Sequence, residues 1–228
     1  MFLKEIRLQA NDLRALYSFY KEVLELRVAY FEGESISVTA GETQLIFEET
    51  NVVENPFYHF AFNIPSNKFE EAFEWVKKKV ALLWLDDYKS NIADFVNWNA
   101  KSFYFLDVAG NILEMIARFD LKDNAVEKFS SSQIRNISEI GLVFPENSFD
   151  DEVNEFMQRF SLSYFNKQPP KPGFRAIGND EGLFITVPEN RAWYPTNDKL
   201  SRILPLYLTF MEDEKLNCFH SNYFNHKK

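Results

Sequence analysis

The chain has little cysteine, no excess of positive charge and no long apolar run. Cys218 is the single cysteine among 228 residues, which excludes an internal disulfide and is typical of a reducing compartment. The formal net charge of −9 argues against a nucleic-acid partner, because phosphate binding requires a basic surface. No apolar run approaches the length of a membrane span, and no secretion signal precedes the first charged, alternating segment. We therefore expect a cytoplasmic protein that binds neither nucleic acid nor a membrane.

Several common signatures of catalytic sites are also missing. The sequence has no Gly-rich phosphate loop, no Ser–His–Asp order and no cysteine pair with metal-ligand spacing. What it has in abundance is core material, since 46% of its residues are hydrophobic and 24 are phenylalanine. A chain of this length forms either one large domain or two to three small modules.

Three segments of the chain share one plan: an alternating strand, a polar residue that can cap a helix, and an amphipathic helix. The predicted strands are residues 3–10, 57–64 and 137–144, and the predicted helices are residues 13–24, 69–79 and 149–160. The capping residues are Asp12, Ser66 and Ser148. Short strand patterns follow each helix, so the sequence predicts a repeated βαβββ module.

This repeat predicts an α+β fold of tandem βαβββ modules. We expect residues 1–50 and 56–118 to pair into one cupped sheet within a unit that ends at residue 120. Residues 121–135 read as a linker, residues 136–210 as a third, shortened module with its final strand near 203–210, and residues 211–228 as a polar tail. The unpaired sheet of the third module needs cover from the first unit or from another chain, which makes a homodimer one expectation.

The most informative segment is residues 103–118, which reads as a strand, a tight turn and a second strand. Alternation places Glu114 on one face of the second strand, between two isoleucines. A carboxylate in such a position needs a partner, because burying it unpaired is costly. The strand pattern at 57–64 carries His59, the only histidine before residue 220. A histidine and a glutamate on two strands of one module indicate a metal site or an acid–base site.

Two segments resemble the vicinal oxygen chelate superfamily, which includes glyoxalase I, extradiol dioxygenases and fosfomycin- and bleomycin-resistance proteins. Residues 11–26 are similar to the family's first helix, and residues 107–115 are similar to its final hairpin. The resemblance covers residues 2–118 well and residues 136–210 loosely. It implies two modules paired into a cup, with ligands from the first and last strand of each. It does not identify the reaction, because the fold hosts isomerases, lyases, dioxygenases, transferases and plain binders.

The resemblance also implies a set of metal ligands. Aligning the first strands by the polar residues before each helix places Glu5, His59 and Glu139 at the equivalent ligand position. With the first two modules paired, the implied site is Glu5, His59 and Glu114. Ile46 then lies where a fourth ligand often sits. One imidazole and two carboxylates suit Mn, Fe(II), Ni or Zn, and three protein ligands leave positions open for substrate oxygens. Relatives commonly have histidine where this chain has Glu5, which puts iron-dependent ring cleavage in doubt.

Two functions are compatible with these residues. The first is a metal-assisted isomerase, lyase or oxygenase that acts on a small, oxygen-rich substrate, with Glu114 doubling as a catalytic base. The second is a metal-free protein that binds a small molecule, as a resistance protein does, between aromatic walls. In that case His59 and Glu114 form a polar cup without an ion, joined by hydrogen bonds.

Further residues are candidate substrate ligands: Arg7, Gln9, Tyr104, Arg191 and Trp193. Arg7 and Gln9 share the cup face of their strand, although a structural ion pair explains Arg7 equally well. Tyr104 either lines a pocket or packs in the core. Arg191 and Trp193 follow the last strand of the third module, where they either cap its cup or form a packed loop. That module offers a lone carboxylate at the ligand position, so we expect no metal there.

Overall fold

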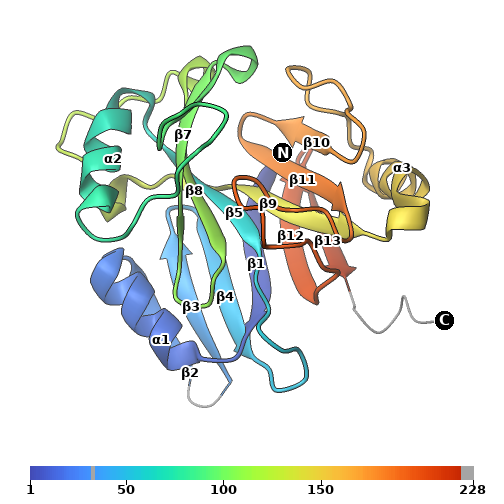
Figure 1. Cartoon of the computed structure of the whole chain (residues 1–228), viewed down its shortest axis with the longest axis horizontal. Helices are drawn as coiled ribbons and strands as arrows, with labels where there is room; N and C mark the ends of the chain where they lie inside the picture. The colour runs from blue at the N-terminus through green and yellow to red at the C-terminus, as the bar shows by residue number, and fades with distance from the viewer. Residues whose placement is uncertain (32–33, 222–228) are drawn as a thin grey trace.

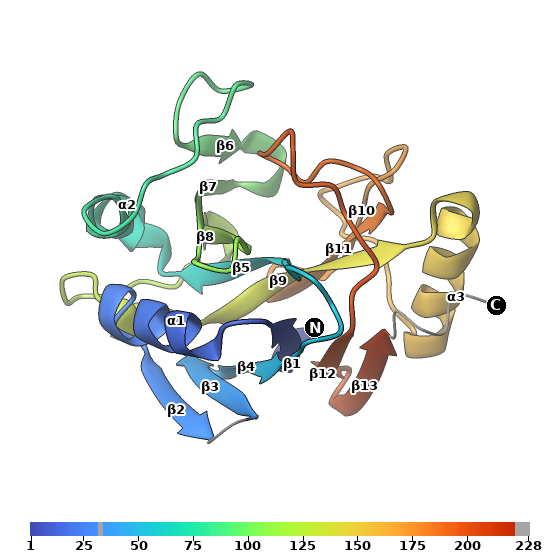
Figure 2. The same cartoon turned by 60° about the horizontal axis from the view of Figure 1, so that its bottom comes forward.

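The computed structural model of the chain describes residues 1–31 and 34–221. Two β-sheets lie one above the other, with the helices at their flanks (Figures 1 and 2). The predicted α+β class, built from βαβββ modules, is confirmed by the order of the elements along the chain. No helix in the described part of the chain is long and apolar enough to span a membrane.

Most strands and helices follow the predicted pattern. The strands of the first sheet are β1 (Phe2–Ala10), β2 (Arg27–Phe31), β3 (Ser35–Ala40), β4 (Thr43–Glu49), β12 (Leu206–Glu212) and β13 (Lys215–Ser221). The strands of the second sheet are β5 (His59–Ile64), β6 (Ala93–Phe95), β7 (Ala100–Leu106), β8 (Ile112–Arg118), β9 (Asn136–Phe144), β10 (Arg175–Asn179) and β11 (Gly182–Pro188). The α-helices are α1 (Leu13–Ser18), α2 (Phe69–Lys77) and α3 (Phe149–Phe160). A π-helix, η1 (Phe19–Val23), continues α1, and the 3-10 helices are η2 (Ser66–Lys68), η3 (Val96–Trp98), η4 (Phe119–Leu121), η5 (Ser131–Gln133) and η6 (Glu146–Ser148).

The core lies between the two sheets, on the faces that the helices also cover. The apolar residues of β1 and β5 are buried there, as their alternation predicts. Phe184 of the second sheet and Phe210 of the first meet edge to face, with ring centroids 5.0 Å apart. The side chain of Asp12 accepts a hydrogen bond from the Ala15 amide at 2.9 Å and caps α1, so this predicted cap is confirmed.

The pairing of the modules differs from the prediction. The sheets have the strand orders β13-β12-β1-β4-β3-β2 and β10-β11-β9-β5-β8-β7-β6. The second module therefore pairs with the third, through antiparallel β5 and β9, and the first module pairs with β12 and β13. The prediction that the first two modules share a cupped sheet is wrong. Alternation fixes which face of a strand is buried, but it does not fix which strand lies beside it.

The end of the chain also departs from the prediction. The strand expected near residues 203–210 is β12, but it joins the first sheet rather than the third module. Residues 215–221, assigned to a polar tail, form β13 beside it, while residues 222–228 lie outside the described residues. Most residues of β13 are not buried, so its sequence lacks the apolar alternation that predicts a strand, although β13 pairs with β12 along its length.

Three irregular segments border the outer face of the second sheet. The strand patterns after the second and third helices predict strands at 81–85 and 162–166. Residues 81–99 instead form a long excursion that contains β6 and η3, and residues 161–174 form only isolated bridges, from Tyr164 to Ile177 and from Lys171 to Phe174. Residues 189–205 run from β11 to β12 and so join the two sheets. Together these segments wall a cavity over the second sheet.

Candidate metal centre and its cavity

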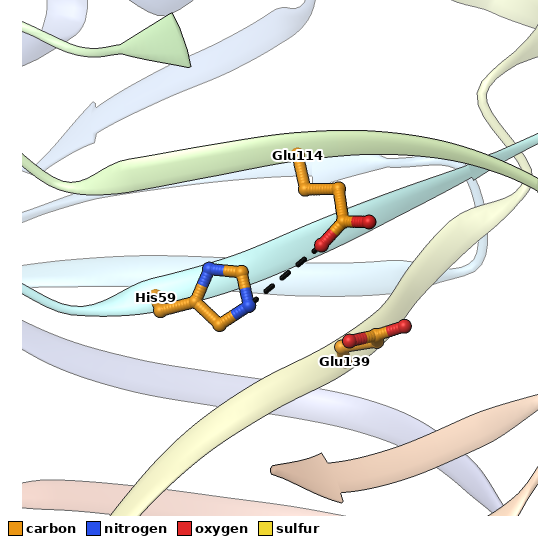
Figure 3. A group of neighbouring side chains, drawn as sticks. All are labelled: His59, Glu114 and Glu139. Atoms are coloured by element: carbon orange, nitrogen blue, oxygen red, sulfur yellow. Dashed lines mark ion pairs between the residues drawn. The ribbon is translucent and has the colours of Figure 1, made fainter. Parts of the chain in front are cut away.

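Three ionisable side chains converge on the outer face of the second sheet. His59 begins β5, and Ala61 of the same strand lies opposite Glu114 of β8 and Glu139 of β9. Each of the three offers a ligand atom, and these atoms lie within 4.8 Å of one another (Figure 3). The exposed fractions are 5% for His59, 2% for Glu114 and 3% for Glu139. We call His59, Glu114 and Glu139 the triad.

The His59 ring is oriented by a backbone contact. Its Nδ1 lies 3.1 Å from the carbonyl oxygen of Ile112, so Nδ1–H donates to that oxygen and leaves Nε2 with a free lone pair. Burial lowers the pKa of His59 to about 4, which keeps the ring neutral at physiological pH. Nε2 is therefore an acceptor that faces the rest of the triad.

Glu114 faces this lone pair with another acceptor. Its Oε2 lies 3.8 Å from His59 Nε2, and its Oε1 is buried without a hydrogen-bond partner among the described residues (Figure 3). Burial, helped by the negative charge of Glu139, holds the pKa of Glu114 well above its usual range. Two acceptors that face each other in a buried site need a proton or a cation between them.

Glu139 is held by a buried arginine. Arg118, at the end of β8, is 1% exposed and donates from Nη2 to Glu139 Oε1. Its Nη1 donates to Ser138 Oγ at 2.8 Å and to Asn63 Oδ1 at 3.3 Å, and its Nε lies 3.9 Å from Asp180 Oδ1. Burial raises the pKa of Glu139, and the positive charge of Arg118 opposes this shift. The arginine thus fixes one oxygen of Glu139 and leaves the other for the triad.

The two strand pairs that carry the triad are equivalent in register, but they do not carry equivalent ligands. Glu139 lies opposite Leu183 in the β9–β11 pair, as His59 lies opposite Ile112 in the β5–β8 pair. Two residues further along, the position equivalent to Glu114 is Ile185, which lines the cavity. An apolar side chain thus stands where a fourth ligand would stand, and three protein ligands leave the cavity side open.

The donors of the triad fit a divalent ion. Ligand atoms at about 2.1 Å from a metal lie roughly 3 to 4 Å from one another, and the 3.8 Å between His59 Nε2 and Glu114 Oε2 falls in this range. One neutral imidazole and two carboxylates suit the borderline and hard divalent metals. The buried Oε1 of Glu114, which has no hydrogen-bond partner among the described residues, is a further oxygen that could coordinate an ion.

The triad forms one wall of a cavity of about 500 Å³. Aromatic side chains make up much of the remaining wall: Tyr88, Phe95, Trp98, Tyr104, Phe174, Trp193 and Tyr194. Trp193 packs against Gly141, where an added Cβ would lie 2.5 Å from the indole, and its ring centroid is 5.5 Å from that of His59. The size and lining of the cavity are typical of a small-molecule site.

The structure brings only part of the predicted site together. Of the residues expected at a metal, His59 and Glu114 lie in the triad, but Glu5 lies on the first sheet, where Arg7 Nε contacts its Oε1 at 2.7 Å. Arg7 also contacts Glu48 Oε1, at 3.2 Å. Its contacts with Glu5 and Glu48 are those of a structural ion pair, which is one of the two alternatives that the sequence left open for Arg7. Arg7 and Gln9 belong to β1 and do not line the cavity; the predicted substrate residues that do are Tyr104, Arg191 and Trp193.

Two residues at the triad have no role in the predicted metal site. The sequence places Glu139 at the ligand position, but it predicts no metal in the third module, because the predicted pairing of modules leaves that carboxylate alone. Arg118 has no role in the predicted site. Its signal was its position four residues after Glu114 on a strand, which places both side chains on one face.

Comparisons with known proteins give the fold. Neither family models nor curated proteins match the sequence. Among solved structures, a proposed dioxygenase of Bacillus subtilis aligns with 82% of this chain at a TM-score of 0.55 and 13% identity, and the chain spans 63% of that protein. A lactoylglutathione lyase of Agrobacterium tumefaciens aligns with 54% of this chain and 97% of its own, with a TM-score of 0.41 and 19% identity. The fosfomycin resistance protein FosX of Listeria monocytogenes aligns with 51% of this chain and 93% of its own, with a TM-score of 0.40 and 21% identity.

The likeness to the Bacillus subtilis structure and the repeated βαβββ modules show the fold. It is the fold that the resemblance of the first helix and final hairpin to the vicinal oxygen chelate superfamily implied. At these identities the likeness concerns the fold, and the chemistry has to be argued from the triad and the cavity.

Proposed function

We propose that the protein is a metal-dependent enzyme that acts on a small, oxygen-bearing molecule in the cavity. His59, Glu114 and Glu139 would hold a divalent ion, which supplies a Lewis acid for substrate oxygens when it is bound. The observation that carries this proposal is the pair of acceptors, His59 Nε2 and Glu114 Oε2, that face each other at 3.8 Å. The reaction class is a metal-assisted isomerase, lyase or oxygenase.

The side chains of the protein would contribute in different ways. The Ile112 carbonyl orients the His59 ring, and Arg118 orients Glu139. Glu114 Oε1 has no partner among the described residues, so this atom can hold a proton taken from the substrate, as a general base does. The triad residues are at most 5% exposed, and electrostatic interactions in such a buried site are stronger than in water.

Metal analysis of the full chain, purified without chelator, tests the proposal. We expect about one equivalent of a divalent metal in the wild type, because three convergent donors bind far better than a lone carboxylate. His59→Gln, Glu114→Gln and Glu139→Gln should each lose most of it. Glu5→Gln is the matched control, since it removes a carboxylate of the same kind from the other sheet and should keep the metal.

Two results would contradict the proposal. One is a wild-type protein that takes up no metal even when Mn, Fe, Ni and Zn are supplied. The other is retention of metal by all three triad variants, which would place the binding site elsewhere.

A metal-free binding protein is the second candidate function, and the raised pKa of Glu114 favours it. A protonated Glu114 can donate to His59 Nε2 after a small movement, which satisfies both groups without an ion. The cavity would then bind a small molecule without converting it. Absence of metal from the wild type and all variants, with a ligand still bound in the cavity, is the result that supports this function.

A further inference from the structure

Two unmatched donors enter the cavity from one segment. Arg191 and Tyr194 lie three residues apart on the loop 189–205, and both line the cavity wall. The Arg191 guanidinium is half-buried, and no carboxylate of the described residues lies within ion-pair distance of it. The Tyr194 hydroxyl is buried and has no hydrogen-bond partner among those residues.

The loop that carries these donors is held in place by its own hydrogen bonds. Ser201 Oγ donates to the Pro188 carbonyl at 2.7 Å and accepts from the Arg191 amide at 3.0 Å. The Trp193 amide donates to the Lys199 carbonyl at 2.9 Å. Arg191 itself stacks over the Phe174 ring, with its guanidinium carbon 5.6 Å from the ring centroid. Arg191 and Tyr194 therefore lie on a segment whose backbone is held in place by hydrogen bonds.

Leaving a guanidinium partly buried without an anion is costly, and burial accordingly lowers the pKa of Arg191. The other charged groups of the cavity wall, apart from the triad, are Lys171, Asp87 and Asp94, and all three are exposed. Their charges are screened by water, so Arg191 is the cation that a bound molecule meets first inside the cavity.

The triad favours an anion only when an ion is bound. Glu139 is paired with Arg118, and a divalent ion held by the triad would add positive charge beside the cavity. Without an ion, the attraction for an anion comes from Arg191. The aromatic side chains of the cavity wall, among them Trp98 and Trp193, offer flat apolar surface.

We propose that the cavity takes an organic acid, with a flat apolar body and a carboxylate that pairs with Arg191 and accepts a hydrogen bond from Tyr194. This inference rests on the proposed function only in taking the same cavity as the substrate site. A guanidinium matches the two oxygens of a carboxylate and makes a charge-assisted contact with it, and the Tyr194 hydroxyl is a further donor on the same segment of the cavity wall.

The test compares two probes that share one ring system and differ in charge, 2-naphthoate and 2-naphthamide. Their binding to the full chain is measured by calorimetry, once with Mn²⁺ and once with EDTA. We expect the acid to bind at least about tenfold tighter than the amide, as a hydrogen bond to a charged group implies. Arg191→Gln should weaken the acid to the level of the amide and leave the amide unchanged. Tyr194→Phe should weaken the acid by roughly twofold to tenfold.

Arg27→Gln is the charge-matched control, because Arg27 is exposed on β2 and lies outside the cavity. It should leave both affinities unchanged, which separates a local contact from the net charge of the protein. Circular dichroism checks that each variant is folded. Where Arg191→Gln does not fold, Arg191→Lys takes its place and should keep a reduced preference for the acid.

Equal affinity for the two probes, absence of binding by both, or an equal loss for both in Arg191→Gln would overturn the inference. The two proposals fail separately. If the protein prefers the acid in EDTA and takes up no metal, this inference stands and the metal site is refuted. If the protein binds stoichiometric metal but does not prefer the acid, the metal site stands and this inference is refuted.

Discussion

Replacing Arg118 with methionine should destabilise the protein more than any surface change. Arg118 is 1% exposed and contacts Glu139, Ser138 and Asn63 at once. Its removal leaves the Glu139 carboxylate buried without its partner, and breaking a buried pair in this way costs about 3 to 5 kcal/mol. Each kcal/mol lowers the melting temperature of a chain of this size by about 2 to 4 °C, so we expect a fall of roughly 6 to 20 °C.

A double-mutant cycle isolates the pair. Glu139→Leu alone should cost less than Arg118→Met, because Arg118 keeps its bonds to Ser138 and Asn63 and lies 3.9 Å from Asp180. The double variant should cost less than the sum by at least about 1.5 kcal/mol, because it leaves neither charge unpaired. Urea unfolding in EDTA, followed by fluorescence and circular dichroism, measures these free energies. Additivity within about 0.5 kcal/mol would refute the role assigned to the pair.

Further predictions concern packing, the contact between the sheets, and pH. Gly141→Ala places a Cβ 2.5 Å from the Trp193 indole, so it should cost about 1 to 3 kcal/mol and alter tryptophan fluorescence; an unchanged spectrum would contradict this packing. Tyr58→Phe removes a donor to the Pro205 carbonyl at 2.7 Å and should cost about 1 to 3 kcal/mol in urea unfolding, whereas no loss would show that water replaces the hydroxyl. Because the pKa of His59 is about 4 when folded and 6.5 ordinarily, the metal-free protein should lose stability as the pH falls from 6.5 toward 4; His59→Gln should lack this part of the loss, and identical pH profiles would be evidence against it.

The sequence predicts most of the modules because most of the strands and the three helices have a local signal. The stripe of apolar residues in α3 predicts its bounds, Phe149–Phe160, as the structure has them. Partner choice has no such signal. β1, β5 and β9 show the same alternation before the same kind of helix, so β5 fits beside β1 or β9 equally well at the level of sequence. What decides between them is the fit of the whole core, which no single segment carries.

The same limit explains why the sequence places only two of the three triad residues in the predicted metal site. His59 and Glu114 belong to one module, so their convergence follows from the module itself. The third ligand comes from the neighbouring module, and a wrong neighbour replaces Glu139 by Glu5. Arg191 and Trp193 line the cavity, whereas the sequence left open whether they cap a cup or form a packed loop. Their role in binding stays a prediction, as do a homodimer and the identity of any metal.

The loop 189–205 gives the cavity a mechanical connection to the far side of the molecule. It leaves β11 in the second sheet, carries Arg191, Trp193 and Tyr194 past the cavity, and enters β12, which pairs with β1 in the first sheet. A molecule held by this loop stabilises only those states in which the loop keeps its place. Local opening of β12 would pull on the loop, so occupancy of the cavity should slow amide hydrogen exchange along β12 and β1, although neither strand lines the cavity. Amide hydrogen exchange in the first sheet then shows whether the cavity over the second sheet is occupied.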